Sequence, residues 1–204
     1  MTALAIALLG AAACARAIDT TKPPVSEGGL HRAVRETLAS QAAGRLGSVE
    51  GIGLITSGPV TIFLANGEVG LIPDSPELEA ALAKLHQRWV EGRRQPLLTQ
   101  ELQGAFLALT AQQLAVKQLG GESLIRFAKT DEKGQYRFEQ VPEGRWLLVG
   151  NLNSTVSAIL WAVPVDVVAG AVSETSLADA NILLEARIEK AEVGQPAKPP
   201  ESHP

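Results

Sequence analysis

Polar and apolar positions alternate through much of the middle of the chain, and this period of two predicts β-strands. Residues 58–64 (GPVTIFL) form a β-branched run between a Gly-Pro and an Asn-Gly turn signal. Asn-Gly is the strongest two-residue signal for a hairpin. We therefore expect residues 68–73 (EVGLIP) to run back alongside residues 58–64 as a first pair of strands.

A second hairpin is predicted in residues 129–150, KTDEKGQYRFEQVPEGRWLLVG. Asp131 suits the first position of a type I turn and Gly134 the left-handed position that follows, and VPEG repeats this pattern. The run YRFE alternates, which predicts a half-exposed strand, whereas WLLV is apolar throughout and predicts a more completely buried one. Further strands are expected at residues 161–167 and 182–184, so that all the strands form an antiparallel β-sandwich.

Between these strands the apolar period changes to three and four residues, which predicts two helices. Ser75 can cap the first helix, with Pro76 in its first turn, and Thr99 can cap the second, which a Gly-Gly pair ends. Residues 75–120 are therefore expected to form a helical hairpin inserted into the β fold, with apolar stripes that bury one another. The stripes comprise Leu78, Leu82, Leu85 and Trp89 on the first helix, and Leu102, Phe106, Leu109 and Val116 on the second.

The beginning of the chain has the pattern of an export segment. Residues 1–17 (MTALAIALLGAAACARA) contain an apolar run of 11 residues, which is short of the roughly 20 that span a bilayer. Cys14 follows three alanines and resembles the cysteine of a bacterial lipobox, although leucine is more usual where Ala11 stands. These features predict a bacterial chain that is periplasmic or anchored through a lipid on Cys14. A cytoplasmic chain with an apolar N-terminal helix is the alternative.

The rest of the chain divides by composition. Residues 18–48 are expected to hold an extended, Pro-containing spacer and then a short amphipathic helix, because Leu30, Val34 and Leu38 recur every four residues. Residues 49–185 are expected to form the β-sandwich with its helical hairpin. Residues 186–204 are rich in Pro and charge, which predicts a disordered tail.

Composition narrows the function classes. The chain of 204 residues has a formal net charge of -4 with both signs interspersed, so there is no basic patch for nucleic acid or for anionic lipid. The single cysteine excludes an intrachain disulfide and a CxxC metal site. His31, His86 and His203 form no HxxxH pair, GIGLIT lacks the third glycine of a dinucleotide loop, and no GxSxG or Walker motif occurs. We therefore predict no enzyme and no catalytic, cofactor-binding or metal-binding residues.

The strongest candidate for a protein–protein contact is a tryptophan with three arginines close to it in the sequence. Trp89 lies beside Arg88, Arg93 and Arg94, and both residue types are enriched in interface hot spots. The alternative is that Trp89 closes the apolar stripe of its helix, since it falls on the spacing of that stripe.

Two further features are candidates for binding. Asn151 and Asn153 belong to a polar stretch expected at one end of the sandwich, where binding loops commonly lie. Trp146 and Trp161 could stack on sugars if they were exposed, although their alternation with Leu and Val favours packing in the core.

The motif TDxxGxYxFxxVPxGxWxL, over residues 130–148, resembles the signature of the carboxypeptidase regulatory-like, or transthyretin-like, β-sandwich domains. The layout is also similar to a bacterial subgroup in which a helical hairpin follows a strand ending in Ile-Pro, here Ile72-Pro73. Matching later segments are residues 161–165 and LADANI at 177–182. Departures are Trp146 where Tyr is more usual, and a shorter helical insertion.

This resemblance implies a non-catalytic module that acts in protein–protein interaction or scaffolding. The expected partner is another envelope protein, with no nucleic acid, and with the membrane approached only through the lipid anchor. The alternative is an accessory module that binds a polysaccharide.

Overall fold

The structure is a computed structural model that describes residues 28–92, 99–153 and 157–187. The predicted export segment with Cys14, the spacer and most of the predicted tail lie outside the described residues.

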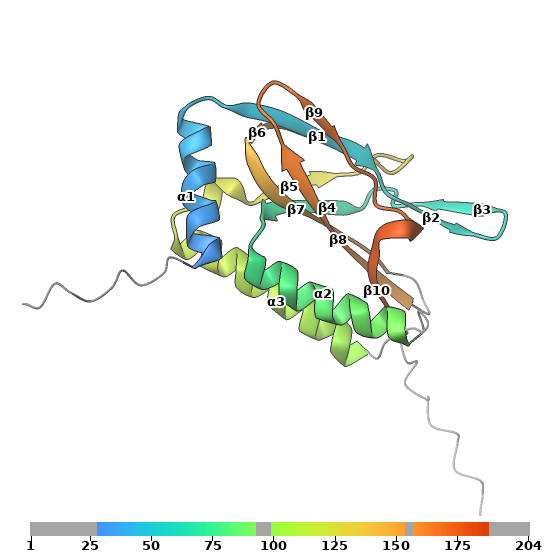
Figure 1. The fold of residues 1–204 in the computed structure, drawn as a ribbon. Helices are drawn as coiled ribbons and strands as arrows, with labels where there is room; N and C mark the ends of the chain where they lie inside the picture. The colour runs from blue at the N-terminus through green and yellow to red at the C-terminus, as the bar shows by residue number, and fades with distance from the viewer. Residues whose placement is uncertain (1–27, 93–98, 154–156, 188–204) are drawn as a thin grey trace, which may run out of the picture.

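Two β-sheets stack face to face, and a pair of helices lies along the second sheet (Figure 1). The three-stranded sheet has the order β6-β1-β9, and the five-stranded sheet the order β10-β8-β7-β4-β5, with antiparallel pairing throughout except between β1 and β9. The predicted mainly-β sandwich with a helical insertion is confirmed. Its strands are β1 (Leu46–Ile52), β4 (Glu68–Pro73), β5 (Arg126–Lys129), β6 (Gln135–Pro142), β7 (Gly144–Asn153), β8 (Ser157–Val167), β9 (Val172–Glu174) and β10 (Ile182–Arg187).

The two turns of residues 129–150 join different sheets, so the prediction of a hydrogen-bonded hairpin there is wrong. The first turn has the predicted geometry, since Gly134 has a φ of 75° and Asp131 Oδ1 accepts hydrogen bonds from the amides of Lys133 and Gln135, both 2.8 Å long. However, β5 pairs with β4, and β6 pairs with β1. A turn signal specifies a reversal of the chain but not the neighbour with which each strand pairs.

The first predicted strand pair is also wrong in its partner. Residues 60–63 form β3 (Val60–Phe63), which pairs with β2 (Leu54–Ser57) through the Gly58-Pro59 turn, and β4 pairs with β5 and β7. Asn66 has a φ of 54°, and the Gly67 amide donates to Thr130 Oγ1 over 2.9 Å. These contacts direct the chain after β3 into the five-stranded sheet.

The helical hairpin covers the outer face of the five-stranded sheet (Figure 1). It consists of α2 (Pro76–Glu91) and α3 (Thr99–Gln118), and the predicted cap is present, with Ser75 Oγ accepting from the Leu78 amide over 3.2 Å. The prediction that the two apolar stripes bury one another is incomplete, because both stripes also pack on side chains of the sheet. This cluster contains Leu78, Leu82, Leu102 and Leu109 from the helices and Ile72, Leu147, Leu160 and Leu184 from the sheet.

One residue of the predicted stripe, Phe106, is not buried. Phe106 is 36% exposed, while the preceding Ala105 is fully buried. The buried positions of α3 are 102, 105, 109, 112 and 116, a pattern in which Phe106 lies at the margin. The small side chain of Ala105 lets the helix lie close to the sheet.

The amphipathic helix before the sandwich is confirmed as α1 (Gly29–Ala42), with Val34 buried and Leu30 and Leu38 partly buried against the core. It contacts β6 and β7, and its Gly29 amide donates to Glu77 Oε1 over 2.9 Å. Two short 3₁₀ helices, η1 (Glu122–Leu124) and η2 (Asp179–Asn181), complete the described elements. None of the helices described here has the length and apolar character needed to cross a membrane.

Candidate functional site

Trp89 lies in the interior, which corrects its interpretation as a contact residue. Its side chain is 3% exposed, and its ring packs 5.7 Å from the His86 ring, centroid to centroid. It closes the apolar stripe of α2, as the alternative predicts. Arg88 is exposed on the same helix, whereas Arg93 and Arg94 lie outside the described residues.

Trp146 and Trp161 are both 0% exposed, so neither ring is available to stack on a sugar. Each indole N–H is satisfied internally, from Trp146 to the Pro142 carbonyl over 2.9 Å and from Trp161 to the Ala178 carbonyl over 3.0 Å. Asn151 and Asn153 lie at the C-terminal end of β7, where they pair with Leu160 and Ala158 of β8. Asn151 is half-buried and Asn153 is exposed.

His86 of α2 contacts the backbone of β10. His86 Nδ1 lies 3.0 Å from the Leu183 carbonyl. Within residues 28–92, 99–153 and 157–187, no group of three His, Cys, Asp or Glu side chains has the arrangement to hold a metal ion.

The surface that sequence reasoning missed is the β2–β3 arm, residues 54–63, which extends away from the two stacked sheets (Figure 1). All of β3 is exposed, with Val60 at 55%, Ile62 at 41% and Phe63 at 39%. The arm lies within residues 51–67, a stretch without a single charged side chain. Val60 and Ile62 share one face of the arm and Phe63 lies on the other, because side chains alternate along a strand; exposed apolar side chains on one element are typical of interaction surfaces.

The arm is a two-residue hairpin with one protected edge. Gly58 has a φ of 59° at the first turn position, as a type II′ turn requires. On the outer edge of β2, the Leu54 amide donates to the Leu177 carbonyl over 2.8 Å, and the Thr56 amide donates to Asp179 Oδ2 over 2.9 Å. These two bonds cover the donors that β2 turns away from β3.

The outer edge of β3 is open. In an antiparallel pair, alternate residues direct both backbone groups toward the partner strand or away from it. Leu54 lies opposite Phe63 and Thr56 opposite Thr61, so Thr61 and Phe63 direct their N–H and C=O groups away from β2. Nothing in the described part of the chain forms a hydrogen bond with these groups. Charged side chains or bulges usually protect such an edge, and β3 has neither.

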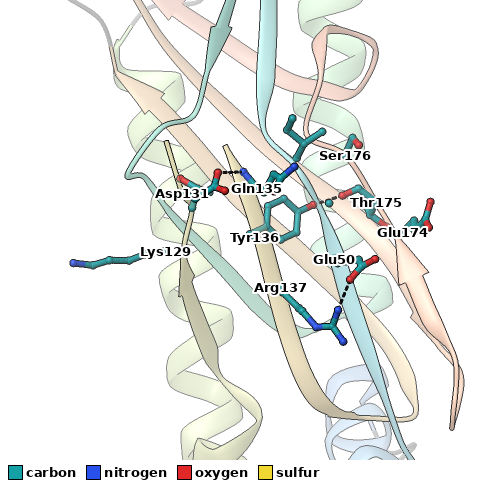
Figure 2. Close-up of a pocket in the computed structure, with 12 residues that line it drawn as sticks. Glu50, Lys129, Asp131, Gln135, Tyr136, Arg137, Glu174, Thr175 and Ser176 are labelled. Carbon is teal, nitrogen blue, oxygen red and sulfur yellow. Dashed lines mark hydrogen bonds and ion pairs between the residues drawn. The ribbon is translucent and has the colours of Figure 1, made fainter. Parts of the chain in front are cut away.

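A second surface feature is an open polar groove of about 810 Å³ over β1, the start of β6 and the segment after β9 (Figure 2). Arg137 bridges Glu50 at 2.8 Å and Glu139 at 3.1 Å. The Tyr136 hydroxyl donates to the Thr175 carbonyl, and burial raises the pKa of this phenol. The groove can hydrogen-bond a polar ligand, but Tyr136, its one aromatic lining residue, is buried and offers no ring face for stacking.

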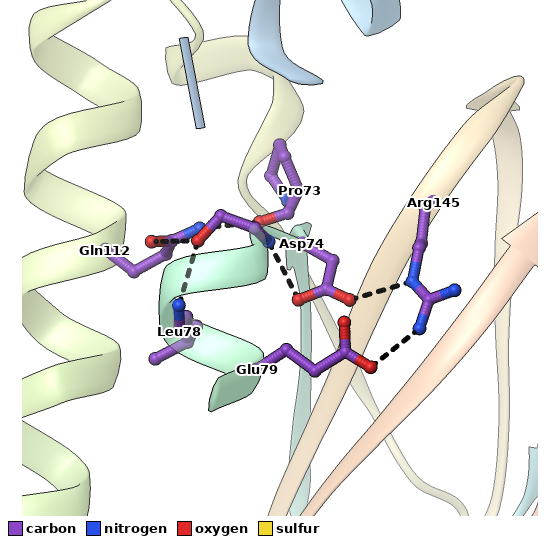
Figure 3. A network of polar contacts seen from close by, with 7 residues as sticks. Pro73, Asp74, Leu78, Glu79, Gln112 and Arg145 are labelled. Carbon is purple, nitrogen blue, oxygen red and sulfur yellow. Dashed lines mark hydrogen bonds and ion pairs between the residues drawn. The ribbon is translucent and has the colours of Figure 1, made fainter. Parts of the chain in front are cut away.

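A polar network joins the start of α2 to the sheet (Figure 3). The Asp74 side chain is 2% exposed and accepts from Arg145 Nε over 3.1 Å, while Arg145 also bridges Glu79 at 2.9 Å. Burial raises the pKa of the Asp74 carboxyl, and the hydrogen bond from Arg145 opposes this effect. Gln112 of α3 accepts from Ser75 Oγ and donates to the Pro73 carbonyl. This arrangement fixes the helical hairpin on the sheet, and it contains no pair of a nucleophile and a general base.

No protein-family model matches the chain, and a search of curated proteins finds no match either. Among the solved structures that are similar to it are the following two. A protein from Pseudomonas aeruginosa provisionally assigned to carbohydrate binding is 16% identical, with a TM-score of 0.40 over 71% of this chain and 95% of its own. The minor pilin of Streptococcus agalactiae is 10% identical, with a TM-score of 0.35 over 74% of this chain and 48% of its own.

Proposed function

We propose that this chain is a non-catalytic module, exported to the cell envelope, that binds another protein through the β2–β3 arm. The observation that carries the proposal is the open β3 edge together with the exposed Val60, Ile62 and Phe63. Backbone groups on such an edge supply affinity by adding a strand, and the side chains supply specificity.

The energetic argument favours a contact on this arm. Val60, Ile62 and Phe63 are each roughly half exposed, so covering what remains contributes about 1 kcal/mol per side chain. Outward backbone groups of Thr61 and Phe63 add hydrogen bonds worth about 0.5–1.5 kcal/mol each. These terms suit a contact of moderate affinity that other surfaces reinforce.

The proposal also includes export of the chain and its assignment to the transthyretin-like subgroup. The short apolar run of residues 1–17 and Cys14 support an exported, lipid-anchored chain. The helical hairpin enters directly after the Ile72-Pro73 end of β4, and this layout supports the resemblance to the transthyretin-like subgroup. Such a module would present its arm to a neighbour in the envelope.

Polysaccharide binding is a second candidate, and the polar groove over β1 and β6 is the observation that favours it. Carboxylate, amide and guanidinium groups line the groove and can pair with sugar hydroxyls. This candidate no longer includes Trp146 or Trp161, because both are buried.

The test is affinity capture of the tagged full chain from its native envelope, in parallel with an Ile62→Lys variant. The matched control is Val172→Lys, which places the same charge at an apolar residue of β9 that is 51% exposed. Thermal unfolding should be similar for all three chains, since neither substituted position lies in the core.

We expect the intact chain and Val172→Lys to recover the same protein, and Ile62→Lys to lose it at least about tenfold, because a buried lysine costs more than 1.4 kcal/mol. Equal recovery by Ile62→Lys would contradict a contact through the arm. If polysaccharide is recovered instead, and Arg137→Ala abolishes that recovery, the groove is the binding site.

A further inference from the structure

We propose that the open edge of β3 pairs with β3 of a second copy of this chain, in an antiparallel arrangement with Ile62 on the two-fold axis. This inference rests on the proposed function, because it names the partner that the arm takes.

The backbone pattern of β3 is suited to pairing with itself. Thr61 and Phe63 are the residues that face outward, and they are two positions apart. With Ile62 on the axis, Thr61 lies opposite Phe63 of the second copy, and Phe63 opposite Thr61 of the second copy. Each of these two pairs exchanges two N–H···O bonds in an antiparallel ladder, so every outward group of the strand is satisfied.

Other registers satisfy fewer groups. If the axis passes through Thr61, Phe63 falls opposite Pro59 of the second copy, and proline has no N–H to donate. If the axis passes through Phe63, Thr61 falls opposite Ala65 of the second copy, which lies beyond the end of β3. The register centred on Ile62 is therefore the one that the geometry favours.

Charge does not oppose pairing of the arm with a second copy. A strand paired antiparallel to itself brings identical or near-identical positions together, so a charged strand repels itself. Residues 51–67 carry no charge, and no lysine or glutamate blocks the edge in the way that protects most exposed strands. The exposed Val60 and Ile62 lie on one face, because they alternate along β3, and this face would continue across the paired arms.

The contact should be weak in dilute solution and stronger on a membrane. Two four-residue strands bury much less than the roughly 800 Å² per partner of a standard interface. Anchoring two copies to one surface raises their effective concentration and converts a weak contact into a stable one.

Site-directed cross-linking of the full chain in its native envelope tests the inference. In the predicted register the two Ile62 residues form a non-hydrogen-bonded pair, with Cβ atoms about 4.5–5.5 Å apart, so a mild oxidant should link Ile62→Cys into a dimer. The matched control is Val60→Cys on the same strand and face, since that residue lies opposite Leu64 of the second copy and about 13 Å from its own counterpart. The unsubstituted chain, with Cys14 alone, gives the background.

We expect Ile62→Cys to form at least about ten times more disulfide-linked dimer than Val60→Cys or the unsubstituted chain. Dimer formation that is equal at the two positions, or greater for Val60→Cys, would overturn the register and the inference. If no dimer forms but Ile62→Lys still loses a captured protein, the arm binds an unlike partner, so the proposed function stands and this inference fails. If no dimer forms and Ile62→Lys changes nothing, both fail.

Discussion

Replacing Gly51 with alanine should be among the most destabilising small substitutions in this fold. Gly51 lies in β1 and lines the polar groove. The Tyr136 hydroxyl, which also lines this groove, donates to the Thr175 carbonyl (Figure 2). A Cβ at this position would lie 1.7 Å from the Thr175 carbonyl oxygen and 2.6 Å from the Tyr136 hydroxyl. Since non-bonded atoms rest about 3.5 Å apart, the backbone at Thr175 has to move.

The magnitude follows from the bonds that this movement breaks. Losing the bond from Tyr136 to Thr175 leaves a buried phenol unpaired, which costs about 1–3 kcal/mol. The Thr175 amide donates to the Glu50 carbonyl over 2.9 Å, and loss of this bond costs about 0.5–1.5 kcal/mol more. We therefore expect Gly51→Ala to lower the free energy of unfolding by about 2–4 kcal/mol.

Urea denaturation followed by the fluorescence of the buried tryptophans measures this change. The matched control is Gly104→Ala at an exposed position of α3, where a new Cβ meets no atom within 4 Å. This control should be more stable than the wild type by about 0.5–1 kcal/mol, because alanine is the better helix former. A Gly51→Ala protein within about 0.5 kcal/mol of the wild type would refute the packing argument for the groove floor.

Two further predictions concern the polar network at the start of α2 (Figure 3). Ser75→Ala should lower the free energy of unfolding by about 1–2 kcal/mol, because it removes the helix cap and a partner of the buried Gln112; a change below about 0.3 kcal/mol in urea denaturation would contradict this role. The pKa of Asp74 is raised in the folded state, so the fold binds a proton at this carboxyl more tightly than the unfolded chain does. The free energy of unfolding of the wild type, minus that of Asp74→Asn, should therefore increase as pH falls from 7 toward about 4. If this difference decreases on acidification, the hydrogen bond from Arg145 outweighs the effect of burial on the pKa of Asp74.

Local signals in the sequence predicted the elements better than their pairing. The cap at Ser75, the left-handed Gly134 and the apolar stripe of α2 depend on neighbours within a few residues, and each is confirmed. The prediction that Phe106 is buried is wrong, because the rotation of α3 on the sheet depends on Ala105 and on residues far away in the chain. Pairing of β4 with β5 and β7 is set by contacts such as Gly67 with Thr130, which no short window contains.

The β2–β3 arm was not predicted from the sequence for the same reason, because its exposure depends on which strands pair. The apolar run GPVTIFL predicts a strand. Without knowledge of its partner, such a run is interpreted as a strand of the core. With β4 assigned as that partner, Ile62 and Phe63 would lie in a sheet interior. With β2 as the partner, the same side chains lie on an exposed arm. The absence of charge in residues 51–67 was the available signal, since surface strands usually carry charged residues at an open edge.

Hydrogen exchange at single amides tests the β2–β3 arm most directly. In the isolated chain at low concentration, the Leu54 and Thr56 amides should be protected by their bonds to Leu177 and Asp179, and the Thr61 and Phe63 amides should exchange rapidly. On reconstitution into envelope membranes, we predict that Thr61 and Phe63 become protected at least about tenfold while the groove residues do not change. Unchanged exchange at Thr61 and Phe63, with new protection elsewhere on the surface, would contradict the assignment of the arm as the contact surface.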